Sequence, residues 1–162
     1  MSEEIKIIEG LIEERQKYLS NMANVLARAG KARRITAASI KVMTIVFGAF
    51  AATSGVAAKF YGDSPYVPVV YTIVGLAIAA IGGLDAAFKY GERATELNRL
   101  AAECETVISQ ANAERMFSLI SHNETSSVVS QARNTLETLN TCINETRKKV
   151  IDFGLHIDRF AG

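Results

Sequence analysis

The sequence has few cysteines and histidines, the residues that form many metal-binding and catalytic sites. It holds two cysteines and two histidines among 162 residues. Cys104 and Cys142 are too few and too far apart to predict a disulfide framework or a zinc site, so we expect buried apolar thiols in a reduced compartment. Glycine-rich phosphate loops, nucleophile elbows and paired metal-binding histidines are also missing. The sequence therefore predicts no enzyme, with no catalytic, cofactor-binding or metal-binding residue.

An excess of charge of one sign is missing too, because 18 Lys and Arg nearly balance 17 Asp and Glu, for a net charge of +1. A dedicated nucleic-acid binder normally shows a basic balance or a basic face with a recognisable motif, so we expect no nucleic-acid partner. The charges that are present are unevenly placed. In the 43 residues from Val42 to Leu84, only Lys59 and Asp63 are charged.

Two uncharged apolar runs in this stretch predict a transmembrane hairpin with spans at about 38–58 and 66–86. Residues 42–58 contain no charge, and residues 35–58 contain only Lys41, which gives about 25 to 36 Å of helix against roughly 30 Å of hydrocarbon. Residues 64–84 form a second uncharged run, and Gly-Asp and Ser-Pro turn signals lie between the runs. The alternative is the buried hairpin of a soluble bundle. It fits less well, because the first run offers only three polar side chains, on differing faces.

The distribution of Lys and Arg predicts the orientation of the hairpin. Five lie from Arg28 to Lys41 and three from Asp85 to Arg99, whereas the connector has only Lys59. Because basic residues favour the cytosolic side, we expect a multi-pass membrane protein with both termini in the cytosol. The lipid bilayer is then its first partner.

The segments on either side of the hairpin have the periodicity of amphipathic helices. The first runs from Glu3 to about Ala29, with Gly30 as an expected break, and a second runs from about Ala86 to about Leu119, continuous with the span. Capping-box spacing in residues 121–124 predicts the start of a last helix. Its heptad stripe, which we expect to pack in a cytosolic bundle or to self-associate, consists of Val129, Ala132, Leu136, Leu139, Ile143, Thr146, Val150, Phe153 and Ile157.

The predicted fold class is therefore an all-α membrane protein, a two-helix transmembrane hairpin with cytosolic amphipathic helices. Residues 1–34 form the N-terminal helix and a basic approach, residues 35–88 the hairpin, and residues 89–162 the C-terminal helical region, a helical hairpin or coiled coil.

Small and polar residues lie on one stripe of each span at alternating three- and four-residue steps. Such stripes let helices in lipid approach closely, either joining the two spans within one chain or contacting another subunit or a water-filled centre. They comprise Thr44, Gly48, Ala51, Gly55 and Ala58 in the first span and Thr72, Gly75, Ala79, Gly82 and Ala86 in the second. At the cytosolic edge, Lys41 and Asp85 are expected at similar depth, where they either pair or act as independent interface charges.

The order of these segments resembles the SLATT family, the SMODS- and SLOG-associating two-transmembrane effector domains. The resemblance covers about residues 5 to 120 in layout and is most specific at the exit of the second span. There Gly82–Phe88 places an acidic residue and then an aromatic before a charged helix that contains Arg93-Ala94. One position departs, since Asn98 stands near where many members carry a histidine.

The resemblance implies an antiviral, abortive-infection effector in the bacterial inner membrane. It also implies a partner from a neighbouring gene, either a sensor protein or an enzyme that makes a nucleotide second messenger. The leading hypothesis is a homo-oligomer that permeabilises or depolarises the membrane when triggered. The alternative is a non-conducting membrane anchor or scaffold that recruits a cytosolic partner through its helical bundle.

Overall fold

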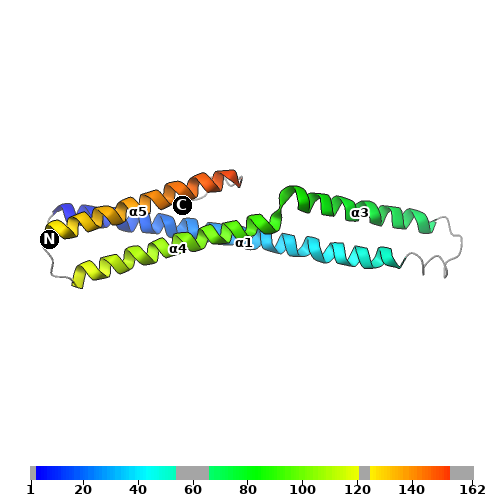
Figure 1. Ribbon diagram of the computed structural model, residues 1–162, viewed down its shortest axis with the longest axis horizontal. Helices are drawn as coiled ribbons and strands as arrows, with labels where there is room; N and C mark the ends of the chain where they lie inside the picture. The colour runs from blue at the N-terminus through cyan, green and yellow to red at the C-terminus, as the bar shows by residue number, and fades with distance from the viewer. Residues whose placement is uncertain (1–2, 54–65, 121–124, 154–162) are drawn as a thin grey trace. The chain divides into compact units, whose positions relative to one another are not determined.

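The computed structural model describes residues 3–53, 66–120 and 125–153. Four helices account for all of these residues except Thr53, Lys89 and Phe153, and no strand occurs among them. Helix α1 spans Glu3–Ala52, α3 Tyr66–Phe88, α4 Tyr90–Ile120 and α5 Thr125–Asp152 (Figure 1). The expected all-helical fold with two long apolar helices is therefore confirmed. The connector, the capping box at 121–124, Gly55, Ala58 and Ile157 lie outside the described residues.

Helix α1 does not break at Gly30, so that expectation is wrong. Gly30 is helical and buried inside a helix of 50 residues. A single glycine costs a helix only about 1 kcal/mol relative to alanine. The long run of good helix formers around Gly30, including Ala27, Ala29 and Ala32, offsets that cost.

Helices α3 and α4 are separate, so the expected continuity through this region is also wrong. Lys89 ends α3 with a φ of 47°, the left-handed conformation that commonly follows the last residue of a helix. Its backbone N–H still donates to the Asp85 carbonyl at 2.8 Å, and Arg93 N–H donates to the Lys89 carbonyl at 3.0 Å. The chain therefore keeps these two backbone hydrogen bonds across the interruption.

The chain divides into two compact units, which we name for their content. The bundle unit comprises Met1–Gly30 and Glu96–Gly162, and the hairpin unit comprises Lys31–Thr95. The expected boundaries were at residues 34 and 88. Helix α1 contributes residues to both units, as does α4.

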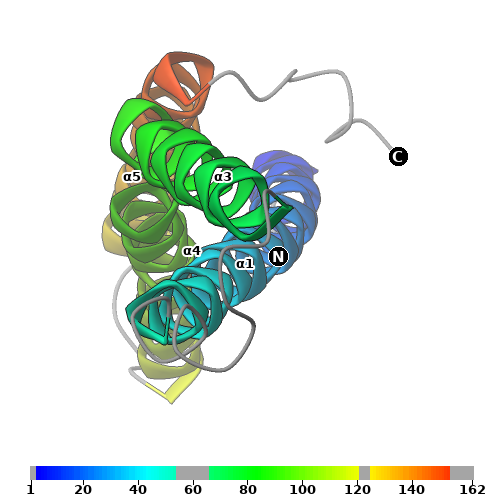
Figure 2. The ribbon, with the colours of Figure 1, turned by 90° about the vertical axis from the view of Figure 1, so that its right-hand side faces the viewer.

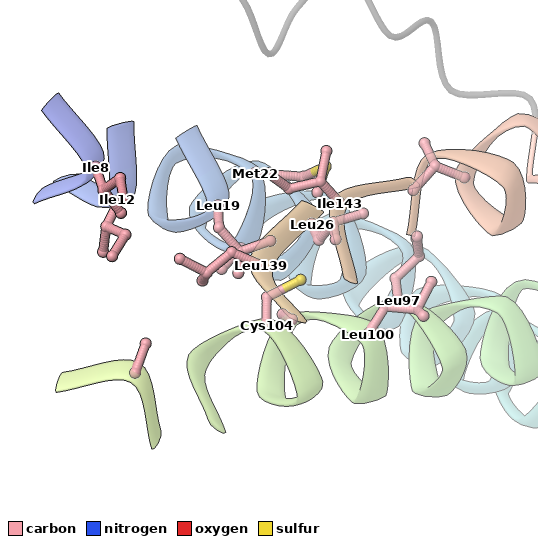
Figure 3. Close-up of a cluster of buried hydrophobic side chains, with 14 residues drawn as sticks. Ile8, Ile12, Leu19, Met22, Leu26, Leu97, Leu100, Cys104, Leu139 and Ile143 are labelled. Carbon is pink, nitrogen blue, oxygen red and sulfur yellow. The ribbon is translucent and has the colours of Figure 1, made fainter. Parts of the chain in front are cut away.

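In the bundle unit, α1, α4 and α5 enclose one apolar cluster (Figure 3). The sequence periodicity places its members, because each helix turns one apolar stripe inward. Helix α1 contributes Leu19, Met22 and Leu26, each with 0% exposure. The other two helices contribute Leu97, Leu100, Cys104, Ala111, Leu139, Ile143 and Val150.

Polar contacts at the rim show how the three helices are aligned. Arg115 pairs with Glu13 at 3.0 Å and Gln16 bonds Asn112 at 3.1 Å, so α4 runs antiparallel to α1. Arg133 pairs with Glu4, and Arg147 Nη2 donates to the Tyr18 hydroxyl at 2.7 Å, so α5 runs parallel to α1. These pairs are mostly exposed and add little stability, but they identify the register of the bundle.

The described part of the hairpin unit consists of the second part of α1, α3 and residues 90–95 at the start of α4. Helix α3 lies beside the second part of α1, as the views in Figures 1 and 2 both show. Where the C-terminal end of α1 meets the N-terminal part of α3, the rings of Phe50 and Tyr71 stack with centroids 5.4 Å apart. Phe88 and Tyr90, on either side of the Lys89 break, approach to 5.5 Å.

Candidate functional site: the apolar hairpin

The two apolar helices of the hairpin unit are exposed along most of their length. Two helical segments are long and apolar enough to cross a membrane, and only 6% and 0% of their most apolar windows are buried. If the two helices formed the buried hairpin of a soluble bundle, most residues of these windows would be buried. Large side chains that remain exposed include Val42, Ile45, Val46, Val69, Ile73, Leu76 and Leu84. Contiguous exposed apolar surface of this kind marks a binding surface for lipid or protein.

Helix α3 contacts α1 mainly through its bulky side chains and not through its own small-residue stripe. Most half-buried residues of α3 recur at three- and four-residue steps, namely Val67, Tyr71, Val74, Ile78, Ile81 and Asp85, and Ala77 lies next to this stripe. On α1 the corresponding residues are Ala37, Ile40, Thr44, Phe47 and Ala51, which are half-buried or buried. The hairpin therefore closes through large residues on α3 against a mixed face on α1.

The small-residue stripe of α3, made of Thr72, Gly75, Ala79 and Gly82, is exposed throughout. A Cβ atom added at Gly75 or Gly82 would meet no atom within 4 Å. Of the first-span stripe, Thr44 and Ala51 are half-buried, whereas Gly48 is exposed and also has open space around it. Gly48, Gly75 and Gly82 thus do not lie against the other apolar helix of the chain, and their role as a packing surface stays a prediction.

The threonines of the two apolar helices satisfy their hydroxyl groups within their own helix. Thr44 Oγ1 donates to the Ile40 carbonyl at 2.9 Å, and Thr72 Oγ1 donates to the Pro68 carbonyl at 2.8 Å. Thr53 donates in the same way to the Phe50 carbonyl at 2.7 Å. A hydroxyl bonded to its own backbone can face an apolar environment without leaving a donor unpaired. Thr44 and Thr72 are thus compatible with hydrocarbon as well as with a polar path.

Lys41 and Asp85, the expected charge pair at the membrane edge, line one cavity of about 620 Å³ together with Lys89 and Glu92. Lys89 Nζ pairs with Glu92 Oε2 at 3.2 Å. No ion pair joins Lys41 to Asp85 among the residues that the structure describes. Direct pairing of Lys41 with Asp85 stays a prediction.

A basic group lies at the base of the hairpin, outside the apolar runs. Burial lowers the pKa of Arg33, and the positive charge of Arg93 lowers it further, while Tyr90 acts in the opposite direction. Arg33 and Arg93 thus bring two guanidinium groups near one another. An anionic group at this level would relieve their repulsion.

The heptad residues of the last helix lie in the bundle unit. Leu139 and Val150 have 0% exposure, Ile143 and Thr146 are buried, and Leu136 is half-buried against the same cluster. The stripe thus packs within the chain against α1 and α4. Self-association through it would require this cluster to open.

The two cysteines, which are far apart in the sequence, lie near the same part of the bundle unit, and the sequence did not predict this. Cys104 is buried in the apolar cluster as expected, but Cys142 is half-buried, packs against the same cluster and lines a groove. Within the described ranges, no group of three or more His, Cys, Asp or Glu side chains is placed to hold a metal ion.

No family model or curated protein matches the sequence, and no solved structure matches the fold. The function proposed below is therefore supported by the geometry of the hairpin and bundle units and not by a known relative.

Proposed function

We propose that this protein is a membrane effector whose hairpin spans the bacterial inner membrane, with both termini in the cytosol. When triggered, it oligomerises and permeabilises or depolarises that membrane. The observation that carries the proposal is the exposure of two adjacent apolar helices, of which 6% and 0% of the most apolar windows are buried. A bilayer is the solvent in which such surface is stable.

Oligomerisation follows from geometry, because two helices cannot enclose an aqueous path. Several copies must therefore contribute spans. The exposed small-residue stripe of α3 is the surface on which a neighbouring span could approach most closely, with open space at Gly75 and Gly82. Helix association in lipid depends on such close approach.

The resemblance to the SLATT family supports the antiviral role and the trigger. A sensor protein or a nucleotide second messenger from a neighbouring gene would act on the bundle unit, the more charged part of the chain. The scaffold hypothesis shares the same membrane insertion. It differs in one measurable respect, because a scaffold leaves the membrane potential unchanged in every state of the partner.

The test is inducible expression in bacteria, alone and together with the neighbouring sensor. Growth, membrane potential by a voltage-sensitive dye, and entry of a membrane-impermeant dye are recorded at the same time. The proposal predicts depolarisation before growth arrest. A stable potential in the presence of the activated partner, with the protein confirmed in the membrane, would instead identify a scaffold.

Variants of α3 connect this activity to the proposed contact. Gly75→Leu combined with Gly82→Leu adds bulk to the small-residue stripe, so we expect membrane insertion to persist and depolarisation to be lost. Ala80→Leu is the matched control, because Ala80 shares a different exposed face with Ile73 and Leu76. Equal depolarisation by the double variant and the control would exclude this stripe as the subunit contact.

A further inference from the structure

The two cysteines of the chain lie at one contact between α4 and α5. Cys104 Sγ is 3.7 Å from Thr146 Oγ1 across this contact. Cys142 precedes Thr146 by one helical turn and so shares its face of α5, and it packs against the cluster that contains Cys104. Figure 3 shows the Cys104 side chain pointing from α4 into that cluster. Each thiol also shifts the pKa of the other, as neighbouring groups do.

The two thiols differ in their access to solvent. Cys104 has 0% exposure, whereas Cys142 lines an open groove of about 830 Å³ between α4 and α5. The charged side chains of this groove are Arg99, Glu103, Glu137, Glu145 and Lys149. A molecule as small as a peroxide can therefore reach Cys142 directly but not Cys104.

The interaction of the two thiols separates their acidities. The neighbouring Cys104 thiol lowers the pKa of Cys142 to about 7, although burial acts against this. The Cys142 thiol, together with burial, raises the pKa of Cys104 well above its ordinary value. The first thiolate therefore forms on Cys142, the more exposed sulfur. An accessible, acidic cysteine beside a second thiol is the arrangement used by redox-sensing proteins.

We propose that Cys104 and Cys142 are a redox-active dithiol, which a peroxide oxidises to a disulfide between α4 and α5. The Cys142 thiolate attacks one peroxide oxygen, the O–O bond breaks, and the leaving hydroxide takes up a proton to become water. Cys142 is then a sulfenic acid. The Cys104 sulfur attacks the Cys142 sulfur, the S–O bond breaks, and the departing hydroxide leaves as water with the Cys104 proton. In total two thiols lose two electrons and two protons, and one peroxide becomes two waters.

Two further contacts join α4 to α5 on either side of the cysteines. Lys149 Nζ lies 3.6 Å from Glu103 Oε2 on one side, and Thr135 donates to Glu114 at 2.6 Å on the other. A disulfide requires the two Cα atoms to lie within about 7 Å of one another, so its formation tests how closely α4 and α5 approach at this point. The proposal goes beyond the membrane function and does not depend on it. Its consequence is a bundle unit that is more stable after oxidation.

The test uses the purified full-length protein, reduced, freed of reductant and treated with hydrogen peroxide. Because the chain has only two cysteines, an intrachain disulfide can only join Cys104 to Cys142. We expect the reduced protein to accept two maleimide labels under denaturing conditions. The oxidised protein should accept none and run as a monomer without reductant, and dithiothreitol should restore both labels. The melting temperature should rise by roughly 5 to 10 °C on oxidation.

Cys142→Ser and Cys104→Ser are the matched controls. Neither should gain stability with peroxide, and Cys104→Ser should accumulate a sulfenic acid on Cys142 that dimedone traps. The melting temperature of each reduced variant shows whether it folds. Two free thiols after peroxide treatment of the wild-type protein, or disulfides only between chains, would overturn the proposal.

Discussion

The bundle unit and the hairpin unit use helices of similar length in opposite ways. In the bundle unit the large apolar residues face one another, so that Leu97 has 0% exposure, whereas Leu76 in the hairpin unit is 66% exposed. The charged residues show the reverse distribution, since they cover the bundle and are nearly missing from the apolar part of the hairpin. The three-four periodicity of large apolar residues therefore marks a buried stripe in the bundle unit, whereas in the hairpin unit large apolar residues also lie on the exposed faces. This difference is the one expected under our proposal, in which the bundle unit lies in water and the hairpin unit in lipid.

The largest expected difference comes from truncating one leucine in each unit. Leu97→Ala should lower the free energy of unfolding by about 2–5 kcal/mol, because it leaves a cavity in a packed cluster. Leu76→Ala removes an exposed side chain and should cost less than about 0.5 kcal/mol. Denaturation of both variants in the same detergent, followed by circular dichroism, measures the contrast. Equal losses would mean that Leu76 is buried within the protein.

A second prediction concerns the reactivity of Cys142. Both cysteines lie in the bundle unit, so this prediction tests that unit without the hairpin unit. Its alkylation rate follows the thiolate and should be half-maximal near pH 7, since the neighbouring Cys104 thiol lowers its pKa to about 7. The rate should fall below that pH and level off above it. Cys104→Ala removes the neighbouring thiol and should move the midpoint upward, whereas Cys104→Ser keeps a polar hydroxyl group there and should move it less. A midpoint unchanged by Cys104→Ala would show that the groove charges, and not Cys104, set this pKa.

Sequence periodicity predicted the inward stripes of the bundle unit well, because burial in water leaves a strong apolar signal. Ile5, Ile8 and Ile12 all lie in the core, as their spacing indicated. The same reasoning misjudged Gly30 and Lys89, because helix ends depend on backbone conformation and on packing as well as on residue type. It also missed the cysteine contact, since proximity across an antiparallel helix pair depends on register. The sequence also did not predict which way the small-residue stripe of α3 faces, because apolar residues surround this helix on every side and give no sign of a buried face.

A third prediction tests the break between α3 and α4. The φ of 47° at Lys89 is unfavourable for a residue with a Cβ atom, so Lys89→Gly should be neutral or stabilise by up to about 1 kcal/mol. Ala87→Gly, two residues earlier inside α3, should instead destabilise by about 0.5–1 kcal/mol. Thermal unfolding of the two variants provides the comparison. Similar destabilisation by both would show that Lys89 is helical in solution.

The smallest expected effect is that of the exposed ion pair between Glu4 and Arg133, whose side chains are 56% and 65% exposed. A double-mutant cycle with Glu4→Gln and Arg133→Gln should give a coupling energy below about 1 kcal/mol. That coupling should shrink further in high salt, because both side chains are accessible to ions. A large, salt-independent value would mean that the bundle register depends on this pair.

The central claim is that the hairpin unit lies in lipid and the bundle unit in water. Its most direct test places the same charge at two equally exposed isoleucines, Ile73 in α3 with 62% exposure and Ile151 in α5 with 58%. Ile73→Asp should impair membrane insertion, at a cost of about 2.5–3.5 kcal/mol near the centre of a span. Ile151→Asp should leave insertion unchanged. The measurement is the fraction of protein that resists alkaline carbonate extraction from bacterial membranes. We expect a marked loss of this fraction for Ile73→Asp alone, and equal extraction of both variants would contradict a hairpin unit in lipid.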